Sequence, residues 1–137
     1  MGYRSQVVLA VDEAIVPAFM AMLAKETQAH DFCFANSDEV ITGYTKKGSF
    51  LFRWDHIKWY DTFPEVQAIE AFMEAATEND LSDYGEKTAP LTKRMNMEDA
   101  EGEWSEHFRF LRIGEEYGDV EEWGYGFDIY MNRAIDY

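Results

Sequence analysis

The sequence contains a single cysteine, Cys33, so an internal disulfide is impossible. A chain of 137 residues does not need one, because a domain of this length buries enough apolar surface to hold a core. We therefore expect one domain in a reducing compartment. The apolar run before Asp12 is too short for a signal peptide, and no stretch approaches the length of a membrane span. These absences predict a cytoplasmic protein.

Basic residues are scarce as well. The chain has 12 Lys and Arg against 27 Asp and Glu, a net charge of −15. Residues 1–60 carry a net charge of −1 and residues 61–137 a net charge of −14. Such a surface repels nucleic acid and anionic lipid, which argues against direct binding of either. The acidic half can simply keep the protein in solution, or it can be offered to a basic surface on a partner protein.

Catalytic and metal-binding motifs are also lacking. There is no G-x-S-x-G, no phosphate-binding glycine motif and no H-E-x-x-H. His30, Asp31 and Cys33 lie close together, but a structural zinc site needs four well-spaced ligands. The acidic run that begins at Glu115 lacks the spacing of an EF-hand loop. We therefore predict a protein that is not an enzyme and that needs no metal or other cofactor.

Aromatic residues are abundant, and they concentrate in the stretch Ser49 to Tyr60, SFLFRWDHIKWY. Residues in a strand alternate between its two faces, so Phe50, Phe52 and Trp54 are expected to point together towards the helices. The alternation changes parity after Asp55-His56, which indicates either a bulge or a tight turn. We favour the turn, and we expect the whole stretch to be scaffold.

Before this stretch, the apolar pattern predicts a buried strand and an amphipathic helix. A polar loop ending in glycine then indicates a β-hairpin. The predicted elements are a strand over Ser5 to Val11, a helix from an Asp12 N-cap to about Thr27, a connection over His30 to Asp38, and hairpin strands over Val40 to Tyr44 and Ser49 to Trp54.

After it, Thr62 and Glu65 form a capping box that starts a second helix, with a proline in its first turn. One face of this helix is apolar, formed by Val66, Ile69, Phe72, Met73 and Ala76, and the other carries Glu70, Glu74 and Glu78. The remaining predictions are a long loop or insertion over 79–105 with a short helix near Thr92 to Glu101, a strand over His107 to Ile113, an exposed acidic connection over Gly114 to Gly124, and a last strand over Tyr125 to Ile135.

This order of elements predicts the fold class. Helices separated by antiparallel strand pairs indicate an α+β two-layer sandwich, in which two helices pack on one face of an antiparallel sheet. The specific topology expected is a ferredoxin-like one with an extra terminal strand.

Three segments, MGYRSQVV at the start, FRWDHIKWY in the middle and FLRIGEEYGDVEE near the end, resemble a family of small acidic proteins encoded by tailed bacteriophages and prophages. The resemblance covers most of the chain outside residues 79–105. The family has no settled biochemical role, so no functional residue is carried over from it. It implies a small accessory protein, outside the virion, made in the bacterial cytoplasm. Such proteins often bind and inhibit a host protein, including defence nucleases.

Two function hypotheses follow. The first is a non-enzymatic inhibitor or modulator that binds a host protein with a basic surface through two groups of acids: Glu115, Glu116, Asp119, Glu121 and Glu122 near the C-terminus, and Glu70, Glu74 and Glu78 on the second helix. The second is a protein that sequesters a small ligand such as a nucleotide signal, with the aromatic segment 50–60 as a stacking wall. Its candidate residues are Arg53, Trp54, Lys58 and Trp59.

Overall fold

Strand β1 (Ser5–Val11) is the centre of the computed structural model, with antiparallel neighbours on both sides. The structure describes residues 2–45, 47–78, 81, 104–116, 118–127, 130–131 and 135–136. After β1 come α1 (Val16–Lys25), α2 (Thr27–Phe34), β2 (Glu39–Thr42), β3 (Phe50–Ile57), α3 (Pro64–Thr77), the 3-10 turn η3 (Trp104–His107), β4 (Phe108–Gly114), β5 (Val120–Trp123), β6 (Tyr130–Met131) and β7 (Ile135–Asp136).

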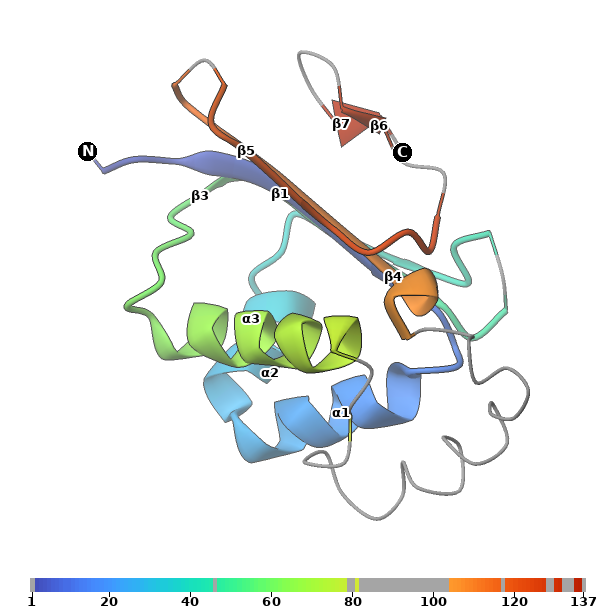
Figure 1. Ribbon diagram of the computed structural model, residues 1–137. Helices are drawn as coiled ribbons and strands as arrows, with labels where there is room; N and C mark the ends of the chain where they lie inside the picture. Colours follow the sequence, from blue (N-terminus) through green and yellow to red (C-terminus); the bar gives the residue numbers. More distant parts are fainter. Residues whose placement is uncertain are drawn as a thin grey trace.

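The main sheet has the strand order β2-β3-β1-β4-β5, and every neighbouring pair is antiparallel. All three helices lie on one face of it, whereas the small β6–β7 sheet lies on the opposite side (Figure 1). The predicted α+β two-layer sandwich is therefore confirmed. The first four strands have the ferredoxin-like order, and β5 is the extra strand beside β4.

The alternation of side chains divides the core between the two faces of the sheet. Phe52, Trp54, Phe108 and Phe110 pack in the large cluster beneath the helices. A smaller cluster on the other face is formed by Val8, Ala10, Leu51 and Leu111. The predicted common orientation of Phe50, Phe52 and Trp54 towards the helices is confirmed. The apolar face predicted for the second helix is buried in α3 as expected.

The first predicted helix is wrong in two respects. It is interrupted at Glu26, which has extended backbone angles and whose carboxylate accepts a hydrogen bond from the Gln28 N–H at 3.2 Å. The segment around His30, predicted as a connection, is consequently the helix α2. Asp12 does not cap α1, because the helix begins at Val16 with Ile15 at its N-cap; the Asp12 carboxylate lies 3.1 Å from Nδ1 of His107. A helix break that depends on one residue leaves little trace in hydrophobic periodicity.

The parity change at Asp55-His56 comes from a bulge, so the favoured turn is wrong. Ser5 pairs with Ile57 and Val7 pairs with Trp54, so β3 uses one residue more than β1 over the same length. The expected capping box at Thr62 is also absent. Phe63 is at the N-cap with no side-chain hydrogen bond, although a proline does occupy the first turn of α3.

The C-terminal part differs most from expectation. The final strand of the main sheet is β5, which lies inside the segment predicted as an acidic connection. Gly124 follows with φ of 78°, and a Cβ there would overlap the carbonyl oxygen of Phe108. The chain turns at that point. Of the predicted strand over residues 125–135, the structure describes β6 and the start of β7, which pair with each other in a separate small sheet, and residues 128–129 and 132–134 lie outside the described residues. The predicted insertion over 79–105 lies outside the described residues, apart from the core residue Leu81 and the start of η3.

Candidate functional site

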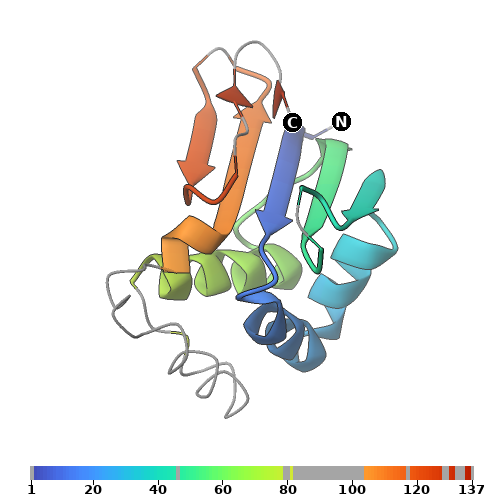
Figure 2. The ribbon, with the colours of Figure 1, turned by 90° about the vertical axis from the view of Figure 1, so that its right-hand side faces the viewer.

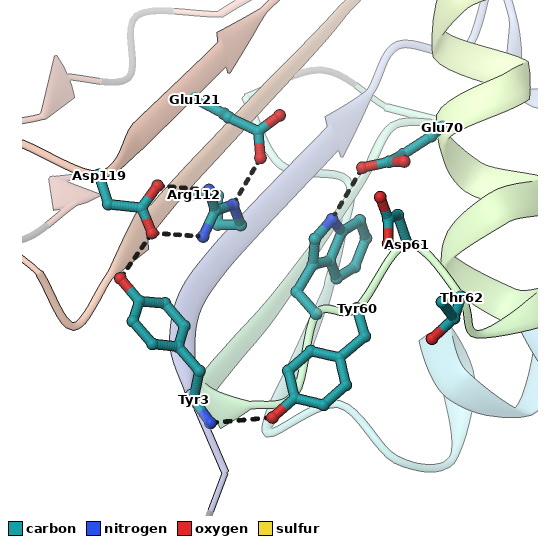
Figure 3. A pocket seen from close by; sticks show the side chains of 9 residues that line it. Tyr3, Tyr60, Asp61, Thr62, Glu70, Arg112, Asp119 and Glu121 are labelled. Carbon is teal, nitrogen blue, oxygen red and sulfur yellow. Dashed lines mark hydrogen bonds and ion pairs between the residues drawn. The ribbon is translucent and has the colours of Figure 1, made fainter.

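An open cleft of about 640 Å3 lies between the sheet and the start of α3 (Figure 3). The N-terminal segment before β1, the β4–β5 hairpin and the chain between β3 and α3 all contribute to it. Its lining residues are Tyr3, Trp59, Tyr60, Asp61, Thr62, Glu70, Arg112, Asp119 and Glu121. The cleft therefore has four carboxylates, one guanidinium and three aromatic rings.

Arg112 organises the sheet side of the cleft. Its Nε donates to Glu121 at 2.6 Å and its Nη2 donates to Asp119 at 2.7 Å. A further bond joins Nη1 to the Ser5 hydroxyl at 3.0 Å. Arg112 has the same strand parity as Phe110, so it emerges on the helix side at the point where the apolar core ends. The cleft is thus the polar end of the space between the two layers.

Tyr3 fastens the N-terminal segment to the hairpin. Its hydroxyl donates to Asp119 at 2.6 Å and accepts a bond from the Glu116 N–H at 2.8 Å. The backbone N–H of Tyr3 donates to the hydroxyl of Tyr60 at 2.8 Å, so both ends of this residue are held. The hydrogen bonds from Arg112 and then Tyr3 lower the pKa of Asp119, which keeps this carboxylate charged.

Glu70 is on the helix side of the cleft, facing the hairpin (Figure 3). It accepts a hydrogen bond from Nε1 of Trp59 at 3.2 Å. Burial raises the pKa of Glu70, the bond from Trp59 opposes the rise, and the charge of Glu121 adds to it. Because four carboxylates share a single guanidinium in its lining, the negative charge of the cleft is only partly neutralised.

The structure brings only some of the predicted acids together. Glu70 from the helix group lines the cleft with Asp119 and Glu121 from the C-terminal group. Glu122 points to the other face of the sheet, where it pairs with Arg109 at 2.6 Å. The others are exposed outside the cleft lining: Glu74 and Glu78 on α3, and Glu115 and Glu116 in the turn between β4 and β5. Glu115 accepts a hydrogen bond from the Arg4 N–H at 2.5 Å.

Of the residues proposed for a stacking wall, the two tryptophans are buried. Trp54 is fully buried and Trp59 is 8% exposed, so neither offers an open ring face to a ligand. Their indole rings lie 6.1 Å apart in the core, and Trp54 Nε1 donates to the Phe32 carbonyl at 3.0 Å. Arg53 pairs with Glu39 and Asp55. Lys58 is half-exposed beside Gly2. The expectation that the aromatic stretch is scaffold fits this burial.

Sequence reasoning missed Tyr3, Tyr60, Asp61 and Arg112 as parts of the cleft. For Arg112 a signal existed, because a charged residue continues the buried face of a strand after Phe108 and Phe110. Such a residue must find partners or emerge at the end of the core. The tyrosines carry no comparable signal, since their contacts join positions that are far apart in the chain.

Within the part of the chain that the structure describes, no three His, Cys, Asp or Glu side chains are arranged to hold a metal. Among the same residues, no helix has the length and apolar character needed to cross a bilayer. No protein-family model, no curated protein and no solved structure matches the chain.

Proposed function

We propose that the protein is a non-enzymatic phage accessory protein that binds a host protein with a basic surface and inhibits or modulates it. The observation that carries the proposal is the cleft, where acids from both predicted groups, Glu70 on α3 with Asp119 and Glu121 on the hairpin, lie on one face. The resemblance to acidic phage proteins supplies the context, a bacterial cytoplasm and a host target such as a defence nuclease.

Charge supports a protein partner over other classes. A net charge of −15 repels nucleic acid and anionic lipid, and it attracts a basic surface over several ångströms. Complementary charge of this kind raises association rates and favours one orientation of the complex. Glu74 and Glu78 extend the negative surface along α3, and both are exposed.

The test compares two variants that lose the same charge. Glu74→Gln with Glu78→Gln removes exposed acids that follow Glu70 along α3, whereas Glu13→Gln with Asp31→Asn removes exposed acids elsewhere. Each tagged protein is expressed in the bacterial host, and captured proteins are quantified by mass spectrometry at several salt concentrations. The captured protein is then purified and its affinity for each variant is measured.

We expect the α3 variant to bind the purified partner about fivefold more weakly, and the other variant to bind like the wild type. We also expect affinity to fall as salt is added, because exposed charges are screened. Equal affinity of both variants and the wild type would contradict the proposal. An equal loss of affinity in both variants would mean that binding depends on the net charge of the protein and not on the acids of α3.

A further inference from the structure

Strand β5 forms an open edge of the main sheet. It is the outermost strand beside β4, and no described residue pairs with its outer side (Figure 2). The Gly114 N–H donates to the Asp119 carbonyl at 2.8 Å, and hydrogen-bonded pairs recur at every second residue of an antiparallel ladder. Glu121 and Trp123 therefore direct their backbone groups towards β4. Val120 and Glu122 direct theirs outward.

Most of these outward groups have no hydrogen-bond partner among the described residues. The Val120 N–H already donates to the Gly118 carbonyl at 3.0 Å. The Val120 carbonyl and both backbone groups of Glu122 point away from the sheet. A row of this kind is a template for another strand, and proteins commonly protect such edges from unwanted pairing.

The side chains beside this edge select the strand that fits. On the helix side, Glu121 lies opposite Arg112 and shares the acidic cleft with Glu70. On the other side, Glu122 is accompanied by Val120, whose 48% exposure is high for an apolar side chain. An added strand would thus contact the Glu121 carboxylate on the cleft side. On the other side it would contact the Glu122 carboxylate and the apolar side chain of Val120.

We propose that the outer edge of β5 accepts an extended basic segment of a partner protein, which adds to the sheet as a sixth strand. Lysine or arginine at alternate positions faces Glu121 and the cleft, and the residues between them contact Val120. Backbone hydrogen bonds provide affinity in such strand addition, and alternate side chains provide specificity. The inference rests on the proposed function and specifies how the partner is recognised.

A second copy of the chain is a poor occupant of this edge. Pairing β5 with β5 would bring Glu121 and Glu122 against the same acids of the other copy, and like charges on facing strands are destabilising. The opposite edge, β2, contributes no residue to the cleft that holds Glu70 and Glu121. The β5 edge is therefore the one with complementary charge for a basic strand.

The experiment uses the full chain and a short synthetic peptide in which lysine alternates with valine. Glu122→Pro removes the outward N–H at a strand position where proline is tolerated on an edge. Glu122→Gln separates the loss of charge from the loss of the N–H. Thr42→Pro is the matched control, since Thr42 is exposed and its N–H points outward from the β2 edge. Affinity is measured by titration, and amide shifts are followed by NMR.

We expect Glu122→Pro to weaken peptide binding about tenfold, with little change for Thr42→Pro. Peptide bound to the wild type should shift the amide of Glu122 and protect it from exchange. A second peptide, N-methylated at alternate residues, keeps its charge but cannot pair, so it tests the mode of binding without altering the protein. Its affinity should also fall about tenfold.

Equal binding of the methylated and unmethylated peptides would overturn strand addition. The proposal would also be overturned if Thr42→Pro abolished peptide binding. Self-association of the chain that is removed by Glu122→Pro would overturn it as well. The two proposals fail in different ways. If Glu122→Pro leaves the affinity for the host partner unchanged but loss of the α3 acids abolishes binding, the proposed function stands and the β5 edge is not the binding site. If neither change affects the partner, both proposals are wrong.

Discussion

Replacing Arg112 with methionine should destabilise the fold more than removing any exposed basic residue. The side chain of Arg112 is 12% exposed, and it bonds to Asp119, Glu121 and the Ser5 hydroxyl. Methionine keeps much of the aliphatic volume of arginine but loses every one of these bonds. The two carboxylates then face each other across the cleft without a counter-charge.

The magnitude follows from the burial of the partners. Removing one member of a fully buried ion pair costs about 3–5 kcal/mol, because the other charge is left uncompensated. Asp119 is 33% exposed and Glu121 is 37% exposed, so water screens part of this penalty. We therefore expect a loss of about 2–3 kcal/mol in the free energy of unfolding. For a domain of this length, the melting temperature should fall by about 10 °C.

The assay is urea denaturation followed by tryptophan fluorescence, with the m-value checked for constancy. Arg4→Met is the matched control, because Arg4 is exposed at the same end of the sheet and its loss changes the net charge equally. It should cost no more than about 0.5 kcal/mol. Adding Asp119→Asn and Glu121→Gln to Arg112→Met should recover part of the loss. A loss for Arg112→Met as small as that for Arg4→Met would refute the central position of Arg112.

Three further predictions concern individual side chains. The pKa of Asp119 is lowered below its ordinary value of 3.8, so its contribution to stability is present above that pH and is lost as the pH falls further. The wild type and Asp119→Asn should therefore differ in the free energy of unfolding, measured by urea denaturation, above that pH, and the difference should disappear as the pH falls. The pKa of Glu70 is raised by burial, so its charge opposes folding once the pH exceeds 4.5. Glu70→Gln should be at least as stable as the wild type at pH 7, and any gain in the free energy of unfolding should vanish in acid. Cys33 is fully buried and burial also raises the pKa of its thiol, so the thiol should react with a disulfide reagent only after the protein opens, as measured by the reaction rate with and without denaturant.

The architecture was largely predictable because it depends on patterns that repeat along the chain. Alternation placed Phe50, Phe52 and Trp54 on the correct face of the sheet, and the 3.6-residue period in α3 identified its buried side. These signals come from many residues at once. An error at one position therefore does not change the predicted strand order.

Features that depend on a single residue were not predictable. The break at Glu26 and the turn at Gly124 each rest on one set of backbone angles and on contacts with distant residues. The cleft is of the same kind, because Tyr3 and Asp119 meet only after β1 and β4 have paired. Sequence reasoning identified acids of the cleft but not the arginine and tyrosine that hold them.

This difference matters for function, because a carboxylate that is already paired within the fold gains less from a partner's cation. Asp119 and Glu121 cannot turn to a basic surface without losing bonds to Arg112, and Glu122 cannot do so without losing Arg109. Breaking such a pair costs energy that a new surface ion pair, worth about 0–1 kcal/mol, does not restore. Tight binding by charge alone is therefore unfavourable at the hairpin, although the sequence places its densest acids there. The unpaired backbone groups of β5 do not have this conflict, so charge can guide the partner to this face while the strand edge holds it.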